Sequence, residues 1–433
     1  MIKVFASAWA LFLGLLLLML GNGIQGTLLG IRGGIEGFST GSMAFVMSAY
    51  FLGFLGGSRM TPELIRRVGH VRVFAALGSM VSAVLILYPT ITDPIAWVIL
   101  RVIVGFCFSG VYVTAESWLN NTVDNANRGK ALSLYLIVQM MGVTAAQGII
   151  GLGDPSGFIL FIIPSVLVSI SFAPILLSVT PTPAFETTKP LSLRELVAIS
   201  PLGCVGVFLL GGVFSAQFGM ASVYGSEAGL SVGQISTFIA AFYLGGLLFQ
   251  YPIGWISDRM DRRVLIFFVS LGAGAAAAIA FLTGTNFAVL TAAAFVVGGL
   301  SNPLYALFLA YTNDMIDGDN MAAASGGLVF LNGVGAIAGP IITGAAMNAV
   351  GPAGFWLFVA ALLLVTSAYA LVRMRLRPTT TSTDDTASYV PVGLSASPVV
   401  VELAQEVYVE NLEELNDDGA EMSPPEDDAV RSA

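Results

Sequence analysis

The chain has 433 residues, of which 56% are hydrophobic and only 10% are charged, and its mean hydropathy is +0.85. Soluble domains carry about a quarter of charged residues, so this composition excludes a soluble globular protein and indicates a polytopic membrane protein. The net charge of −9 is unevenly distributed, because the residues after Arg377 hold thirteen acidic side chains and a single basic one, Arg431. The rest of the chain is mildly basic and shows no sign of a nucleic-acid partner.

Twelve apolar segments have the length of about 20 residues that crosses a hydrocarbon core as a helix. They begin near residues 6, 42, 72, 95, 131, 157, 201, 232, 264, 287, 323 and 353. Of the 18 basic residues, only Arg32 falls in a loop on the far side and only Arg101 falls within a segment. Because Lys and Arg accumulate on the cytoplasmic side, we expect both termini to be cytoplasmic.

The sequence repeats itself with a shift of 192 positions, which places residues 37–53 on residues 229–245. Parallel repeats of this kind occur in secondary transporters, with the substrate bound near the membrane midplane between them. We therefore predict an all-α membrane protein with 12 transmembrane helices in two six-helix pseudo-symmetric bundles. The expected domains are the bundles at 1–180 and 201–377, a cytoplasmic linker with an amphipathic helix at 181–200, and an acidic, mostly disordered cytoplasmic tail at 378–433.

The first segment contains residues 21–26, GNGIQG, which match the dinucleotide fingerprint by letters alone. That fingerprint needs a preceding strand, so close helix packing by small residues is the better interpretation. Gln25 in this segment is equivalent by the repeat to Gln217 in the seventh. Two interpretations stay open: each amide satisfies a neighbouring backbone group, or the pair faces a cavity and binds substrate.

The fourth segment carries two ionisable side chains, Arg101 and Glu116. Ionisable groups inside a membrane are costly and are candidates for function, although a long arginine side chain can also reach the interface. Glu116 shares a helical face with Tyr112 and Asn120. It is either a proton carrier or an interfacial acid paired with a loop arginine, and both alternatives remain open here.

Two further amides, Gln147 in the fifth segment and Asn332 in the eleventh, complete the predicted cavity. Their alternative role is hydrogen bonding between helices. The predicted substrate-binding residues are Gln25, Arg101, Gln147, Gln217 and Asn332, with Glu116 and Arg101 as the candidates for proton coupling.

Residues 252–263, PIGWISDRMDRR, form a charged hinge between two apolar segments. The pattern Gly-x-x-x-Asp-Arg-x-x-Arg-Arg resembles the loop signature of the major facilitator superfamily. The matching residues are Gly254, Asp258, Arg259, Arg262 and Arg263. Three other segments, SAYFLGF, AESWLNNTVDNANRGKALSLY and YTNDM followed by ASGGLVFLNGVGAIAGP, are similar to the bacterial YcaD-like branch of this superfamily. The resemblance extends to about Arg377 and implies the major facilitator fold and an inner-membrane transporter.

The resemblance also implies a cytoplasmic gate, in which the loop acid of one half contacts the start of a helix pair in the other half. Asp258 would then contact the start of the fifth segment, at Arg128 and Lys130. The first half lacks this acid, because Arg66 occupies the equivalent position in the loop predicted at residues 59–72. We expect Arg66 and Arg67 to contact the acidic loop before the eleventh segment, at Asp314.

These observations predict a secondary active transporter that moves a small solute by alternating access, with proton coupling, and not an enzyme. No cofactor or metal is expected, and the expected partners are the solute and membrane lipid, with the chain as a monomer. The alternative is a membrane sensor or receptor that signals through the acidic tail. Within that tail, VVVELAQEVYVENLEEL is amphipathic and either docks on a surface or, as we expect, forms a solvated tether. The substrate and the direction of transport are left open.

Overall fold

The computed structural model describes most of the chain. The described residues are 2–122, 127–176, 192–284, 286–316, 318–376, 389–393, 399–401 and 403–409. Most of the predicted linker and tail therefore lies outside the described residues, and the side chains of 2–7 also lie outside them.

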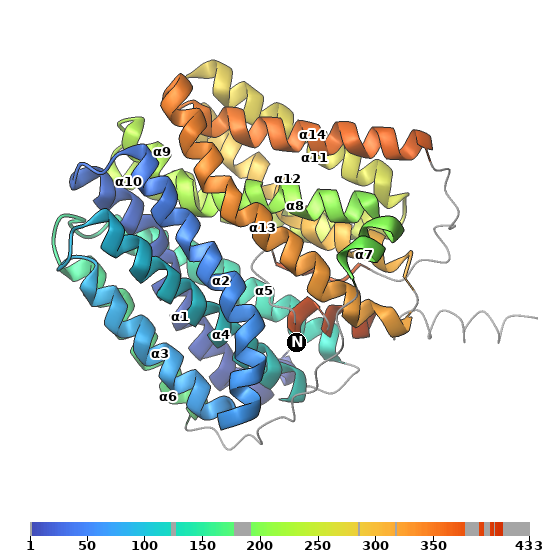
Figure 1. Cartoon of the computed structure of the whole chain (residues 1–433), viewed down its shortest axis with the longest axis horizontal. Coiled ribbons are helices and arrows are strands. Elements are labelled where there is room, and N and C mark those ends of the chain that lie inside the picture. Colours follow the sequence, from blue (N-terminus) through green and yellow to red (C-terminus); the bar gives the residue numbers. More distant parts are fainter. Residues whose placement is uncertain are drawn as a thin grey trace, which may run out of the picture.

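Within these ranges the chain is helical (Figure 1). The first half contains α1 (Ile2–Ile35), α2 (Thr40–Val68), α3 (His70–Leu87), α4 (Pro94–Thr122), α5 (Arg128–Ile150) and α6 (Ile159–Leu176). A short helix follows, α7 (Leu193–Ile199). The second half contains α8 (Pro201–Ser215), the π-helical turn η2 (Ala216–Met220), α9 (Ala221–Glu227), α10 (Val232–Ser257), α11 (Arg262–Thr283), α12 (Phe287–Asn313), α13 (Gly318–Val350) and α14 (Gly354–Leu376).

Eleven spans in the described part of the chain are long and apolar enough to cross a membrane. Helices α8, η2 and α9 run on as one such span, Pro201–Glu227. The sixth predicted segment is helical too, but its apolar stretch, Ile159–Pro174, is shorter than the others. The all-helical prediction is therefore confirmed, with eleven full-length candidates and one shorter helix in place of twelve equal spans.

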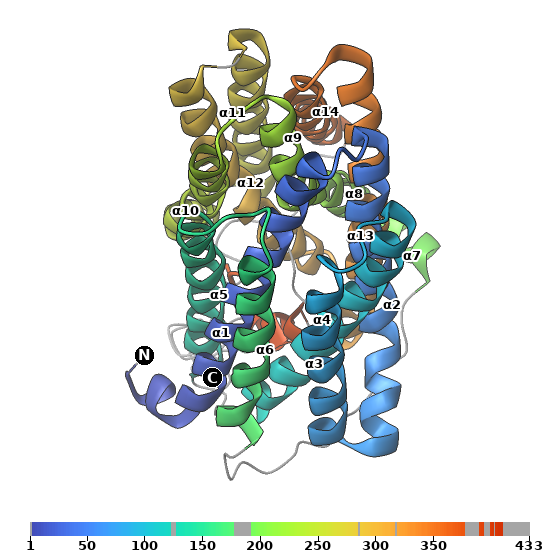
Figure 2. The same cartoon turned by 90° about the vertical axis from the view of Figure 1, so that its left-hand side faces the viewer.

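Helices of each half of the sequence pack mainly against one another. In the first half the largest contacts join α2 with α4 and α1 with α5 and α6, and in the second half they join α10 with α12, α11 with α14 and α8 with α13. Helix α13 crosses to α2, α10 crosses to α5 and α9 lies against α1. Figures 1 and 2 show α1–α6 below and the helices of the second half above.

The sequence repeat produces the same local structure twice. Gly37 and Gly229 both have a φ of 73°, which glycine adopts without a steric penalty, and each ends a helix in the same turn. Two residues later, Ser39 and Ser231 cap α2 and α10 by accepting a hydrogen bond from a backbone N–H of the first turn. The 192-residue shift thus places equivalent helix starts after equivalent turns.

Close helix crossings repeat as well. A Cβ on Gly53 of α2 would overlap the carbonyl oxygen of Val102 on α4, and a Cβ on Gly245 of α10 would overlap that of Phe295 on α12. Small residues allow two helix backbones to approach in an apolar environment, where hydrophobic burial does not drive association. These glycines therefore determine how close the paired helices lie in both halves.

The loop predicted at residues 59–72 is wrong, because α2 continues to Val68 and α3 begins at His70. Pro62 lies inside α2, and Gly69, with a φ of 86°, provides the sharp turn between the two helices. Arg66 and Arg67 are consequently on the last helical turn of α2 and not in an irregular loop.

The described part of the tail is not a solvated tether. Residues 399–401 and 403–409 are helical, and Val401, Leu403 and Tyr408 are buried. This segment is drawn in red in Figure 1, near the first turn of α5, and Figure 2 shows it from the side. These residues therefore dock on the protein, which is one of the two roles considered for this amphipathic segment.

Candidate functional site

A central cavity of about 60 Å³ lies between helices of the two halves. Its walls come from α1, α2, α4 and α5 on one side and from α8, η2, α10, α12 and α13 on the other. Most of the lining is aromatic or aliphatic, and the polar side chains are few. The polar lining residues other than tyrosine are Asn22, Ser58, Gln139 and Asn332.

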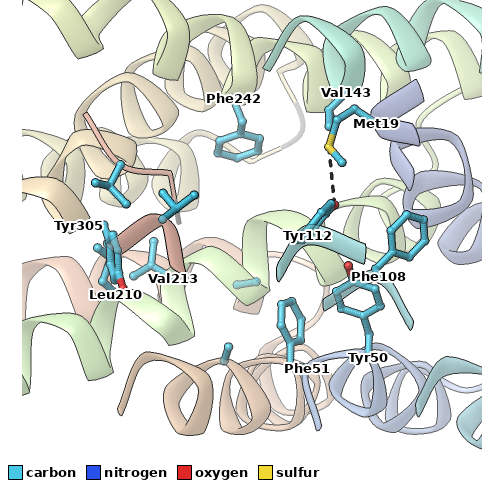
Figure 3. Packing of buried hydrophobic residues seen from close by; sticks show 14 of the residues in the cluster. Met19, Tyr50, Phe51, Phe108, Tyr112, Val143, Leu210, Val213, Phe242 and Tyr305 are labelled. Atoms are coloured by element: carbon cyan, nitrogen blue, oxygen red, sulfur yellow. Dashed lines mark hydrogen bonds between the residues drawn. The ribbon is translucent and has the colours of Figure 1, made fainter. Parts of the chain in front are cut away.

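Aromatic rings from the two halves meet in this cavity. The Phe51 and Phe214 ring centroids are 6.1 Å apart, and those of Tyr50 and Phe218 are 5.8 Å apart. Figure 3 shows Tyr112 pointing toward Met19, with Tyr50 and Phe51 beside it. Offset and edge-on ring contacts of this type favour flat apolar groups, so the cavity suits a ligand with a planar or apolar body.

A chain of hydrogen bonds leads from the cavity wall to the buried Arg101. Tyr112 accepts a bond of 2.9 Å from Nδ2 of Asn22, and Asn22 Oδ1 accepts one of 2.9 Å from Nε2 of Gln25. Gln25 Oε1 in turn accepts a bond of 2.5 Å from Nη1 of Arg101. Gln25 therefore binds side chains in place of a backbone group, and it is one step removed from the cavity lining, which it reaches through Asn22.

Arg101 is fully buried. Its guanidinium lies 4.8 Å from the centroid of the Tyr50 ring, and Nη2 is 3.4 Å from Sδ of Met47. No carboxylate among the described residues forms an ion pair with it. A buried cation that is held by an amide and an aromatic face leaves positive potential beside the cavity. Snorkelling to the interface does not occur.

Glu116 is also fully buried, and its Oε1 accepts a hydrogen bond of 2.5 Å from the Tyr135 hydroxyl of α5. The structure places this acid on the same helix as Arg101 and Tyr112, one turn beyond Tyr112.

The remaining predicted amides occupy three different surroundings. Asn332 lines the cavity and donates to the Val207 carbonyl at 3.0 Å. Gln217, in the π-helical turn η2, donates to Ser301 Oγ at 3.0 Å. Gln147 donates to the Val143 carbonyl of its own helix at 3.3 Å. Of the five predicted binding residues, only Asn332 is among the residues that line the cavity directly.

Asp258, the acid of the charged hinge, lies at the end of α10 and faces the tail. Its Oδ1 accepts a hydrogen bond of 2.6 Å from the backbone N–H of Tyr389. Burial raises the pKa of this carboxyl, while the Tyr389 bond and the charges of Arg262 and Arg259 act in the opposite direction. Gly254, one turn earlier, has no room for a side chain because the Tyr389 ring lies against it.

The hinge arginines are held locally. Arg262 forms a buried ion pair with Asp314 at the end of α12, and Asp314 also accepts a hydrogen bond from the Tyr408 hydroxyl. Arg263 pairs with Asp261 at 2.8 Å. Arg259 donates to the Trp255 carbonyl at 2.9 Å and lies 4.1 Å from its ring centroid.

The predicted gate pairs are not formed in this arrangement. Arg66 and Arg67 both bind Glu63 of their own helix, at 2.7 Å and 2.6 Å, and do not pair with Asp314. Arg128 pairs with Glu406 of the tail at 2.6 Å, and Lys130 lies 3.4 Å from Asn127 Oδ1. Asp258 and Arg128 therefore each bind the tail.

Sequence reasoning missed Asn22 and Tyr50, which belong to the cavity and to the Arg101 surroundings. The available signal was weak: Asn22 lies between the glycines of the GNGIQG stretch, three residues before Gln25, and therefore on the same helical face. Tyr50 comes from α2, and only the packing of α2 against α4 brings it to Arg101.

Comparisons with known proteins agree with the fold. The family model of the Major Facilitator Superfamily matches residues 11–227 and 202–403. The MFS-type transporter YcaD of Escherichia fergusonii is 27% identical over 343 residues, which cover 77% of this chain and 87% of that protein. Its counterpart in Salmonella heidelberg is 27% identical over 338 residues, 76% of this chain and 86% of that protein.

Two solved structures share the fold. The nucleoside transporter NupG, as a D323A mutant, superposes with a TM-score of 0.72 at 16% identity, covering 84% of this chain and 99% of that one. A bacterial homologue of the human lysosomal transporter Spinster, in an inward-facing and unoccupied conformation, gives a TM-score of 0.63 at 13% identity, covering 94% and 98%. With these matches spanning most of its length and an all-helical membrane fold around a central cavity, the chain belongs to the Major Facilitator Superfamily and is a membrane transporter of the YcaD-like branch.

Proposed function

We propose that the protein is a secondary active transporter that moves a small organic solute by alternating access around the central cavity. The observation that carries this proposal is the cavity itself, whose walls come from helices of both halves of the sequence. A site built at the boundary of two repeated units opens to one side or the other when the units rotate against each other. This motion needs no catalytic chemistry.

The proposed moving parts are two six-helix bundles at residues 1–180 and 201–377, with the linker at 181–200 on the cytoplasmic side. The repeated turns at Gly37 and Gly229 and the repeated crossings at Gly53 and Gly245 support an origin by duplication. The asymmetric distribution of basic residues supports cytoplasmic termini and insertion in the bacterial inner membrane. The working unit is a monomer, because the cavity is complete within one chain.

The proposed substrate is a small solute with a flat apolar body and at most one negative charge. The aromatic walls suit the body, and Asn22, Tyr112 and Asn332 offer hydrogen bonds to polar substituents. Arg101 supplies positive potential through Gln25. A nucleoside, the substrate named for the structural neighbour NupG, has a flat base and polar hydroxyl groups that suit such a lining, but it lacks the negative charge.

The proposed coupling ion is the proton, with Glu116 as its carrier. Glu116 is a buried carboxylic acid bonded to Tyr135, and buried ionisable groups in membrane helices mark ion or proton pathways. Arg101, about four turns earlier on the same helix, provides a second charge whose position can respond to the solute.

The test is uptake by purified protein in proteoliposomes, with a panel of nucleosides, aromatic carboxylates and neutral aromatic solutes, with and without an inward-directed proton gradient. We expect saturable uptake of at least one class, and acceleration by the gradient. Asn332→Leu, which fills the cavity, should abolish uptake. Thr237→Val, on the exposed face of α10, should leave uptake unchanged.

The absence of saturable uptake for every class, in protein whose folding is verified by thermal unfolding, would contradict the proposal. Uptake that is equal with and without the gradient would retain the carrier but remove the proton coupling.

A further inference from the structure

The tail re-enters the molecule at the cytoplasmic end of the two halves. Its described residues, 389–393 and 399–409 apart from 402, lie beside α5, α10 and α12. The buried side chains of this segment are Val390, Val392, Val400, Val401, Leu403, Ala404, Gln405, Val407 and Tyr408. A segment with this many buried side chains is packed into the protein and does not rest on its surface.

The first part of the segment lines a vestibule together with α5, α10 and α12. Tyr389, Pro391, Val392 and Gly393 form part of its lining, together with Met140, which also lines the central cavity. Tyr389 is fixed at three points on α10: its N–H bonds to Asp258, its hydroxyl accepts a bond of 2.6 Å from Gln250, and its ring lies against Gly254. The segment therefore lies between the central cavity and the cytoplasm.

The second part, the helical residues 399–401 and 403–409, contacts both halves through polar side chains. Glu406 pairs with Arg128 at the first residue of α5, with 2.6 Å between Oε2 and Nη1. Gln405 donates to Asn313 Oδ1 at 2.9 Å, and Tyr408 donates to Asp314, both at the end of α12. One short helix thus connects the first half of the chain to the second at their cytoplasmic ends.

We propose that the described tail residues, 389–393, 399–401 and 403–409, form an intramolecular plug that holds the transporter open toward the cytoplasm and obstructs the path from the cavity to the cell interior. This proposal rests on the proposed transport function. The transporter can complete its cycle only if the cytoplasmic ends of the two halves approach each other, and the plug lies between these ends. The tail must therefore leave before the cytoplasmic side closes.

Contacts on the opposite side of the molecule support this assignment. Thr40, at the start of α2, donates to Glu227 of α9 at 3.0 Å, and Gly30 and Gly34 of α1 lie against Ser222 and Ser226 of α9. The ends remote from the tail are therefore packed directly against each other across the two halves. Only the cytoplasmic ends have a third segment between them in the described part of the chain.

The plug also occupies the groups that the sequence analysis assigned to a gate. Asp258 and Arg128 were expected to meet, and each one binds a tail residue in its place, Tyr389 and Glu406 respectively. Docking of the tail and closure of the gate therefore compete for the same side chains. This competition makes the two states mutually exclusive.

The first experiment measures docking without any need for a substrate. The chain is truncated after Arg377, placed in lipid nanodiscs, and titrated with a fluorescent synthetic peptide of residues 387–411. We expect saturable binding, and weakening by roughly tenfold or more when the peptide carries Tyr389→Ala and Glu406→Arg, because these changes remove two anchor points and reverse one charge. A scrambled peptide of the same composition is the matched control.

Charge reversal gives a specific check of the Arg128–Glu406 contact. The peptide with Glu406→Arg alone should bind the truncated protein weakly and regain affinity for the truncated protein with Arg128→Glu, whereas the native peptide should show the opposite preference. Equal binding of native and scrambled peptides would overturn the proposal, and so would the absence of saturable binding.

The second experiment measures turnover, once a transported solute is known. We expect the truncated protein to transport faster than the full chain, and added native peptide to slow it again. Slower or unchanged transport after truncation would overturn the plug while leaving the carrier function intact. A complete lack of transport in both forms, together with saturable peptide binding, would instead refute the transport function and retain the docked segment.

Discussion

Oδ1 of Asp258 accepts a hydrogen bond of 2.6 Å from the backbone N–H of Tyr389, so the acid of the charged hinge binds a residue that lies beyond the last helix of the second half. The loop motif had predicted a contact between Asp258 and the start of α5. Arg128, at the start of α5, likewise pairs with Glu406 of the tail and not with Asp258.

Asp258 should make the stability of the docked arrangement depend on pH. Burial raises its pKa above the ordinary value of 3.8. At pH values between the ordinary and the raised pKa, the folded protein therefore binds more protons than the unfolded chain. Stability is therefore greatest below the ordinary pKa and decreases as the pH rises through the interval up to the raised pKa. Asp258→Asn keeps an oxygen that accepts the Tyr389 bond but removes the titration.

The measurement is thermal unfolding of the full chain and of Asp258→Asn between about pH 7 and pH 4. We expect the unfolding temperature of the native chain to rise relative to that of the variant as the pH falls. A constant difference across this range, or one that changes in the opposite direction, would contradict the assignment.

Arg101 should be required for binding of an anionic solute. Arg101→Lys keeps the charge but loses the planar fork that contacts Gln25 and lies near Tyr50, and a buried hydrogen bond left unmade costs about 1–3 kcal/mol. We expect KM for an anionic solute to rise about tenfold for that reason. Arg375→Lys, at the exposed end of α14, is the matched control and should leave KM unchanged.

Glu116 should link uptake to the proton gradient. In Glu116→Gln the side chain keeps its size and an oxygen for the Tyr135 bond but carries no titratable proton. We expect gradient-driven accumulation to disappear while exchange of labelled for unlabelled solute continues. Glu63→Gln, near the C-terminal end of α2, serves as the control, and accumulation that survives in Glu116→Gln would exclude Glu116 as the proton carrier.

The glycine crossings should tolerate no added methyl group. In Gly245→Ala the new Cβ would overlap the carbonyl oxygen of Phe295, and forcing an extra methyl into a packed helix contact costs about 1–3 kcal/mol. Gly233→Ala in the first turn of the same helix meets no atom within 4 Å and should not lose stability. Thermal unfolding in detergent compares the two variants, and equal unfolding temperatures would show that the α10–α12 crossing adapts.

Local patterns in the sequence were sufficient for the helices and for the repeat. Runs of about 20 apolar residues define spans because a helix satisfies every backbone hydrogen bond within one segment in an apolar medium. The equivalent turns at Gly37 and Gly229 followed from residue types that recur 192 positions apart. The end of α2 was misplaced because charged residues near 59–72 resemble a loop, whereas the helix continues to Val68.

The site was only partly predictable. Arg101 and Glu116 stood out because ionisable residues are rare in such segments. Arg101 binds Gln25, which in turn binds Asn22, and Glu116 binds Tyr135. These partners come from other helices, and the apolar pattern of each helix does not specify which neighbour it meets.

The sequence by itself determined a helical membrane carrier with a duplicated body and an acidic tail, because composition, segment length and repetition are properties of the chain alone. Only the tertiary structure decided which polar side chains meet in the cavity, and that the described tail residues contact α5 of the first half and α10 and α12 of the second. The physical reason is that side-chain pairing depends on how helices distant in the chain cross. The amphipathic pattern of the tail shows that it can bury one face but does not specify the surface that covers it.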